Sequence, residues 1–245
     1  MIKLIKSISR MLKNTVNDPY IIDKLISQAE IVTIDGKNYV RKRYACEVGV
    51  MKWLPPALFL KPIYPFTLEP RERLKREICF FKSVWQGFKV PGILSYDENK
   101  LELIREYVEG RLINYRSEDD LRILAKVFAE VHSKGYALGD VKPTNFLVSD
   151  DGDVYVIDAE QAVSNANTDS RSWDLLATLL ISSYFYIANV VKYKEVIKVF
   201  FREYLSNGGN EEVLVNIASQ KFIGLAILIP LPHLIGIVEV LEDLI

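Results

Sequence analysis

Apolar and polar positions alternate in short runs through the first half of the chain, the pattern of β-strands. Residues 29–44 hold two such runs on either side of Asp35 and Gly36, a dipeptide that favours a tight turn, and they predict a β-hairpin. Runs at 92–96 and 101–107 predict a second strand pair.

Other segments have apolar residues at the spacing of α-helices. Pro70 suits the first turn of a helix that continues to Lys82, and apolar residues at helical spacing predict another helix over 119–134. Four prolines in residues 53–66 predict a connecting loop, and the chain after about residue 164 is mainly helical. The pattern predicts an α+β fold in which a small antiparallel sheet precedes a helical part.

The first thirteen residues have the pattern of an amphipathic basic helix. Isoleucines and a leucine follow one face, and lysines and an arginine follow the other. An uninterrupted apolar stretch and a small-residue cleavage site are both missing from this segment, so it does not match a signal peptide. We expect the helix to pack on its own domain, with docking to a membrane surface or a protein as the alternative.

Composition indicates a globular protein of the cytoplasm. The chain has 245 residues, 49% of them hydrophobic, and a formal net charge of -1, which supplies no drive toward nucleic acid. Its two cysteines, Cys46 and Cys79, are too few for a disulfide framework and are expected to be reduced.

Two apolar stretches have the length of a membrane span, but neither is predicted to be one. Residues 175–191 are rich in Ser and Tyr and suit a buried central helix. Residues 222–238 are interrupted by Pro230 and Pro232.

The residues with the clearest chemical pattern lie between positions 138 and 158. Asp140 and Asn145 stand in a loop, and Asp158 follows a β-branched run that would hold it rigidly. Phosphoryl transfer needs a carboxylate to orient the acceptor hydroxyl and oxygen ligands for Mg²⁺ on the phosphates. Asp140 suits the first role, and Asn145 with Asp158 suits the second; the alternative is a surface hairpin with solvated acidic groups.

Residues 140–145, Asp-Val-Lys-Pro-Thr-Asn, resemble the catalytic loop Asp-x-Lys-Pro-x-Asn of the Ser/Thr kinases, and Asp158 falls at the metal-binding Asp of that superfamily. The resemblance implies a two-lobed protein-kinase-like fold that uses ATP and Mg²⁺. It divides the chain into an N-terminal extension (1–26), an N-lobe (27–108) and a C-lobe (109–245). In the resembling kinases, Lys142 would neutralise the transferred γ-phosphoryl group.

The same resemblance assigns nucleotide-binding roles in the first part of the chain. Val40 and Lys42 share one strand face, as the adenine-contacting residue and the phosphate lysine of a kinase do. Glu77 is placed to pair with that lysine from the following helix. Lys42 and Glu77 each also have a plain alternative, as an exposed strand charge and a solvated helix charge. The rival basic residues for the phosphate role are Arg41, Arg43 and Lys52.

Residues 103–110 resemble a kinase hinge, whose backbone at Glu106 and Val108 would bind the adenine edge. Asp174 resembles the buried Asp that holds the catalytic loop backbone, although an ordinary early helix residue favoured by the dipole would look the same. His132 resembles a packing position of the superfamily, and we assign it no chemistry.

Several positions depart from the usual kinase pattern. Residues 27–30, Ser-Gln-Ala-Glu, replace the Gly-rich loop, and Leu138 replaces the His of the catalytic motif. Ala159 and Glu160 replace the Phe and Gly after the metal Asp, and only fifteen residues separate Asp158 from Asp174. These features resemble atypical branches, namely the kinase of the KEOPS complex, the RIO kinases and the lipopolysaccharide core kinases.

The sequence therefore predicts an ATP- and Mg²⁺-dependent atypical Ser/Thr protein kinase with a short activation segment. Lys142 favours a protein substrate with a Ser or Thr hydroxyl. The segment after Asp158 also resembles that of the aminoglycoside and choline kinases, so a small-molecule, glycan or lipid kinase is the alternative. A pseudokinase scaffold, motivated by the missing Gly-rich loop, is the second alternative.

Overall fold

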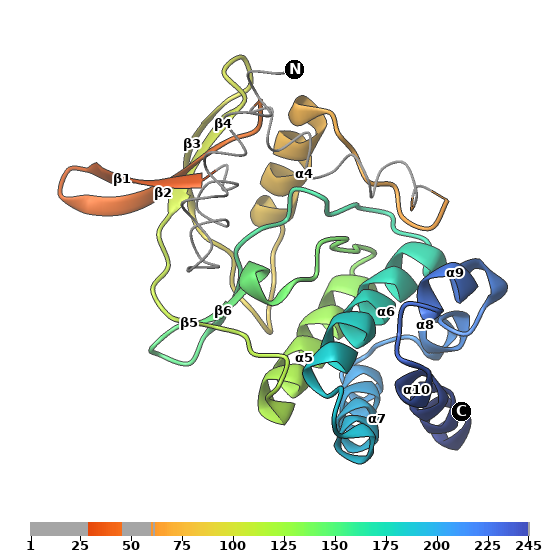
Figure 1. Cartoon of the computed structure of the whole chain (residues 1–245). Coiled ribbons are helices and arrows are strands. Elements are labelled where there is room, and N and C mark those ends of the chain that lie inside the picture. The colour runs from red at the N-terminus through yellow and green to blue at the C-terminus, as the bar shows by residue number, and fades with distance from the viewer. Residues whose placement is uncertain (1–28, 46–59, 61, 245) are drawn as a thin grey trace, which may run out of the picture.

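The computed structural model describes residues 29–45, 60 and 62–244. The expected N-terminal helix lies outside these residues, as do Ser27, Gln28, Cys46 and Lys52. Within them the chain forms a mixed α+β fold, with a strand-rich region beside α4 and a second region built from α5 to α10 (Figure 1).

A four-stranded antiparallel sheet forms the first region, in the order β1-β2-β4-β3. The expected hairpin turn is present, since Asp35 and Gly36 both have left-handed φ angles, 49° and 77°. Both expected strand pairs are confirmed, with these bounds: β1 (Ala29–Ile34), β2 (Lys37–Arg43), β3 (Ile93–Asp97) and β4 (Glu102–Glu106).

Helix α4 (Pro70–Lys82) has the bounds that the sequence predicts. Pro70 opens it, where the missing backbone N–H costs no intrahelical hydrogen bond. Leu74 and Ile78 lie on its buried face in the hydrophobic core, and Arg73 and Glu77 are buried on the same helix. Two charged side chains on the buried face of α4 require charged partners inside the protein.

A three-stranded sheet, ordered β5-β6-β7, connects the two regions. The hairpin of β6 (Phe146–Val148) and β7 (Val154–Val156) is predicted by the sequence, whereas the two-residue strand β5 (Arg111–Leu112) is not. A 3-10 turn, η1 (Pro143–Asn145), leads directly into β6. The second sheet therefore joins the expected catalytic loop to the strand that precedes Asp158.

The helical region is built around α5 and α6. Side chains of Ser117 and Asn167 accept hydrogen bonds from the first turns of these two helices. The helices and the second 3-10 turn have these bounds: α5 (Glu118–Ser133), α6 (Thr168–Phe185), α7 (Val190–Ser206), α8 (Glu211–Asn216), η2 (Gln220–Phe222), α9 (Ile223–Ala226) and α10 (Leu231–Leu244).

The two apolar stretches are divided between elements. Residues 175–191, expected in one central helix, end α6 at Phe185 and start α7 at Val190, which corrects the prediction. Asn189 caps α7 by accepting from the Lys192 N–H, and this cap fixes the new helix start. The break of 222–238 at Pro230 is confirmed, because α10 starts after it, whereas Pro232 is the second residue of α10 and does not interrupt the helix.

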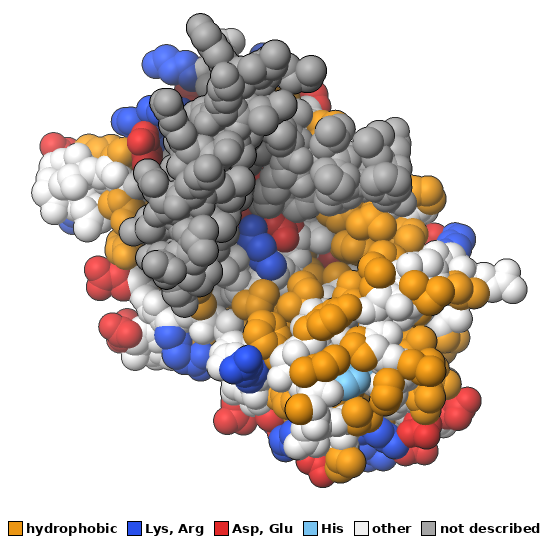
Figure 2. Space-filling view, in the orientation of Figure 1, with side chains coloured by type: hydrophobic (Ala, Val, Ile, Leu, Met, Phe, Trp, Pro, Cys, Tyr) orange, Lys and Arg blue, Asp and Glu red, His pale blue; other side chains and the backbone are white. Residues whose placement is uncertain are grey.

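Apolar side chains also gather on the surface of the helical region (Figure 2). Those with more than half of their area exposed include Ile223, Ile227 and Leu231. Among the helices of the described residues, none combines the length and the apolar character needed to cross a bilayer. Packing of the N-terminal segment on its own domain, and the alternative of docking to a membrane or a protein, both stay predictions.

The chain is closely packed around Gly139, the residue just before Asp140. Its φ is +76°, and a Cβ atom would lie 2.5 Å from the Tyr64 ring. Gly135 has the same φ with nothing within 4 Å. We expect Gly135→Ala to cost about 1–2 kcal/mol of unfolding free energy, from backbone strain alone. Gly139→Ala should cost a further ~1–3 kcal/mol from overpacking.

Denaturant unfolding of the two variants beside the unmodified chain measures this difference. Equal losses for both glycines would contradict the close packing of Tyr64 against this loop.

Candidate active site

The ammonium group of Lys42 lies at the centre of a buried ion cluster. Its Nζ is 2.7 Å from Glu77 Oε2, 2.8 Å from Asp158 Oδ1 and 3.3 Å from Glu160 Oε2. An ammonium group has three donors, so each N–H can face one carboxylate. Glu77 and Asp158 stand 35 and 116 positions from Lys42 in the sequence. The structure thus brings together three residues that the sequence analysis placed in one site.

The alternation of side chains along β2 places Lys42, and not its basic neighbours, in the ion cluster. Successive side chains on a strand point to opposite faces, so Arg41 and Arg43 face away from Lys42. Both arginines form ion pairs with Glu30 and Glu102, at the sheet surface. Among the described residues weighed for the phosphate role, Lys42 is the one in the cluster.

Helix α4 contributes two charged residues, one turn apart, to the same cluster. Glu77 is fully buried, and its Oε2 accepts hydrogen bonds from Lys42 and from the Tyr44 hydroxyl. Arg73, also fully buried, lies 3.3 Å from Glu160 and donates to the Tyr44 carbonyl at 2.6 Å. Residues i and i+4 share a helix face. The same face of α4 therefore contacts β2 through Glu77 and the segment after Asp158 through Arg73.

The charges of the cluster are strongly coupled. Burial disfavours the charged form of Lys42, but the carboxylates of Asp158, Glu160 and Glu77 outweigh it and raise the lysine pKa well above its ordinary value. Burial raises the pKa of Glu77, which Lys42 lowers in part. Glu77 Oε1 is buried and has no hydrogen-bond partner. Glu77 therefore keeps one unsatisfied acceptor inside the cluster.

Asp174 of α6 holds the backbone of the expected catalytic loop. Its two carboxylate oxygens accept hydrogen bonds from the backbone N–H groups of Leu138 (2.6 Å) and Gly139 (2.8 Å). Its neighbour Trp173 donates to the Gly139 carbonyl at 2.7 Å. The loop-holding role expected for Asp174 is confirmed, and the reading as a plain helix residue is wrong. Both α6 residues fix the chain immediately before Asp140.

The expected catalytic loop is compact. Lys142 Nζ lies 3.2 Å from Asp140 Oδ2, and Asn145 Nδ2 donates to the Asp140 carbonyl at 2.8 Å. Asn145 also accepts, through its backbone carbonyl, the N–H of Ile157 at 2.9 Å. Because Asp158 follows Ile157, this bond places the two expected metal ligands on adjacent backbone segments.

The residues expected to contact adenine lie on β2, at the end of β4 and just beyond it. Val40 on β2 pairs with Arg105, so the two side chains share the sheet face that carries Lys42. Arg105 is buried, which lowers its pKa, and its Nη1 donates to the Glu106 carbonyl at 3.2 Å. Val108, half-buried, follows two residues after β4 ends. Arg105 therefore already uses one acceptor position of the Glu106 carbonyl, part of the backbone expected to bind the adenine edge.

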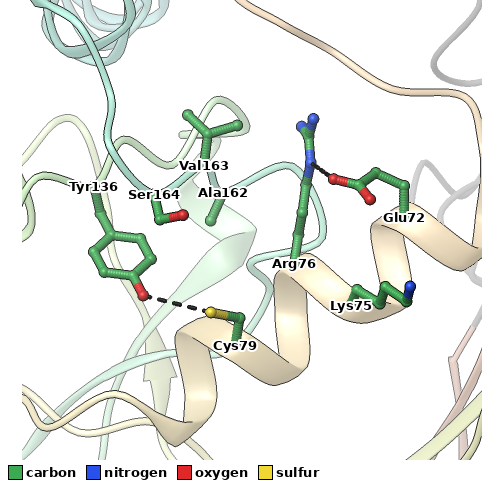
Figure 3. Close-up of a pocket in the computed structure, with 8 residues that line it drawn as sticks. All are labelled: Glu72, Lys75, Arg76, Cys79, Tyr136, Ala162, Val163 and Ser164. Carbon is green, nitrogen blue, oxygen red and sulfur yellow. Dashed lines mark hydrogen bonds and ion pairs between the residues drawn. The ribbon is translucent and has the colours of Figure 1, made fainter.

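A separate pocket of about 340 Å³ lies on another face of α4 (Figure 3). Ala162, Val163 and Ser164, which follow the ion cluster in sequence, line its far side. Cys79 lies in this pocket as a free thiol, 3.6 Å from the Tyr136 hydroxyl. The pocket shows that α4 and the segment after Asp158 also meet outside the cluster.

Sequence reasoning did not assign roles to Arg73, Tyr44 and Arg105, and it noted Glu160 only as a departure from the kinase pattern. Arg73 and Glu77 have the i, i+4 spacing that could have indicated a shared face. Tyr44 follows Lys42 by two residues, so the strand alternation places both on one face. The spacing indicates which of these side chains share a face, but not the residues that they contact, which are distant in sequence.

No protein-family model matches the chain, and no curated protein sequence matches it significantly. The assignment of chemistry therefore depends on the geometry. Carboxylates around a buried lysine, beside a fixed loop with an Asp, a Lys and an Asn, can bind phosphate and a hard cation.

His132 gives the site region a pH dependence. Its ring is buried between Asp174, 3.3 Å away, and the Tyr204 hydroxyl, 2.9 Å away, and burial lowers its pKa. As pH falls, His132 is therefore protonated in the unfolded chain before it is protonated in the folded chain. The free energy of unfolding should then decrease below about pH 6.5. The slope should be at most about 1.4 kcal/mol per pH unit.

Urea unfolding between pH 5 and 8 measures this slope for His132→Gln, with His233→Gln as the control. We expect His132→Gln to reduce the slope and the control to retain it. The same slope in both variants would assign the pH dependence to other groups.

Proposed function

We propose that the chain is an ATP- and Mg²⁺-dependent phosphotransferase, an atypical Ser/Thr kinase of the protein-kinase superfamily. The observation that carries the proposal is the contact of Lys42 with Glu77 and Asp158, at 2.7 and 2.8 Å. The sequence resemblance expects these residues, from three separate segments, to meet. A chance likeness of the catalytic loop alone would not require that contact.

The arrangement of the fold supports the same proposal. A small antiparallel sheet with α4 stands apart from the helical region, and the second sheet lies between them (Figure 1). This α+β arrangement supports the proposal of a two-lobed organisation. The tether from Asp174 to the loop before Asp140 also lies where the resemblance expects it.

The proposed mechanism assigns one role to each side chain. Asp140 accepts the hydrogen bond of the acceptor hydroxyl and orients its oxygen toward the γ-phosphoryl group. Lys142, next to Asp140, neutralises charge on the transferred group, and Lys42 binds the phosphates. Asn145 and Asp158 supply oxygen ligands that fit Mg²⁺, which when bound offsets the negative charge of the phosphates. Ser or Thr hydroxyls of protein are the proposed acceptors.

Asp140→Ala should reduce transfer of labelled phosphate from ATP to a generic protein substrate, or to the chain itself, by about 10²–10⁴-fold. The change removes the group that orients the acceptor oxygen and leaves the buried cluster intact. Asp151→Ala, in the exposed turn of the β6–β7 hairpin, is the control and should keep full activity.

The other two candidate functions predict different results. Labelling of free sugars or lipids without labelling of protein would support a small-molecule, glycan or lipid kinase. Nucleotide binding without any turnover, unchanged in Asp140→Ala, would support a pseudokinase scaffold and contradict the proposal.

Arg105 gives a test of the adenine site. Arg105→Met removes a donor that uses one of the two acceptor positions of the Glu106 carbonyl, so adenine would meet less competition for this oxygen. One hydrogen bond gained should lower the KM for ATP by about 2–10-fold. Arg43→Met, on the outer face of β2, should leave the KM unchanged. A KM that rises or stays constant in Arg105→Met would place adenine elsewhere.

A further inference from the structure

Arg105, on β4, is one of three buried basic residues in and beside the ion cluster, together with Lys42 and Arg73, and only 7% of it is exposed. Lys42 and Arg73 each lie within 3.3 Å of a carboxylate oxygen, whereas Arg105 has no ion pair among the described residues. Burial lowers the pKa of Arg105, and the more distant carboxylates of Glu77 and Asp158 raise it in part. A buried guanidinium needs hydrogen-bond acceptors as well as balanced charge, and Arg105 lacks part of them.

One edge of the Arg105 guanidinium is occupied and another is free. Its Nη1 donates to the Glu106 carbonyl at 3.2 Å, which is the hydrogen bond that the described residues give this group. Its Nε is buried and has no partner. Arginine carries five N–H donors in a rigid fork, and Nε with Nη2 forms an edge that can pair with two acceptors at once. A two-donor edge therefore remains free on the group that contacts the Glu106 carbonyl.

The sheet register places Arg105 at the base end of the proposed nucleotide site. Arg105 pairs with Val40 and shares the sheet face that carries Lys42. Lys42 is the residue proposed to bind the phosphates, and the backbone at Glu106 is expected to bind the base. The position of the base, and with it the inference below, rests on the proposed function.

A two-donor edge favours a purine that presents two acceptors. Guanine and hypoxanthine carry the acceptors O6 and N7 on one edge, whereas adenine carries N7 beside an amino group that is itself a donor. Arginine pairs with O6 and N7 through two hydrogen bonds. The adenine amino group would instead face the arginine donors, which disfavours adenine.

We propose that Arg105 determines the base specificity of this site, which takes 6-oxopurine nucleotides such as GTP and ITP in preference to ATP. The transfer step itself stays the same. The acceptor oxygen forms a bond to the γ-phosphorus, the bond from that phosphorus to the β-phosphate oxygen breaks, and the hydroxyl proton leaves through Asp140. GDP or IDP is then released in place of ADP, and ATP is the weaker phosphoryl donor.

Competition binding to the full chain with Mg²⁺ tests the specificity without a transfer step. IDP and ADP, which differ at C6 and at the N1 proton that accompanies the 6-oxo group, each displace a fluorescent N-methylanthraniloyl-ADP probe. IDP should bind about 5–100-fold more tightly than ADP. Arg105→Met should remove this preference, whereas Arg43→Met, at the sheet surface, should retain it. ADP binding at least as tightly as IDP in the unmodified chain, or an unchanged ratio in Arg105→Met, would overturn the proposal.

A change in the nucleotide covers the case in which Arg105→Met does not fold. The diphosphate of 7-deazaguanosine lacks the N7 acceptor and should bind the unmodified chain about tenfold more weakly than GDP. Equal affinity for these two nucleotides would overturn the two-donor contact.

Phosphate transfer separates this inference from the proposed function. A preference for IDP that depends on Arg105, in a chain that transfers no phosphate from GTP or ATP, would retain the inference and refute the proposed function. Transfer from ATP by a chain that binds ADP at least as tightly as IDP would refute the inference alone. A chain that binds neither nucleotide would refute both.

Discussion

The Lys42 ammonium is the point at which three distant segments meet, and the arrangement of the sheet, α4 and the segment after Asp158 depends on it. Its contacts to Glu77, Asp158 and Glu160 are all at 3.3 Å or less in a buried environment. Removing one member of a buried charge group leaves the others without compensation, which costs more than the contact itself supplies. The cluster thus specifies how these elements are placed more than it adds net stability.

Asp174 is a second fixed point, at the C-terminal end of the segment that starts at Asp158. It holds the loop before Asp140 through two backbone N–H groups, while Glu160 and Asp158 hold the start of the segment through Lys42. Only fifteen residues separate Asp158 from Asp174. Because the chain is anchored at both ends of so short a connection, the expected catalytic loop and the cluster are positioned together.

Local sequence patterns predicted many of the helices and strands. The other features could not be predicted because they depend on contacts between residues that are distant in sequence. Pro70 and the apolar spacing give the bounds of α4, and Asp35-Gly36 gives the first hairpin. Strand β5 has two residues, too few for any periodicity, and exists through its pairing with β6. Arg73 and Arg105 were assigned no role from the sequence, since nothing local indicates the carboxylate and the carbonyl groups that they meet inside the fold.

Charge balance explains why residues that look ordinary singly form a site together. The three acidic groups, two of them buried and Asp158 half-buried, would repel one another, and three buried basic groups would be desolvated at great cost, but the two sets compensate. The balanced cluster therefore acts as a structural anchor, because the loss of any one member would leave an uncompensated charge inside the fold.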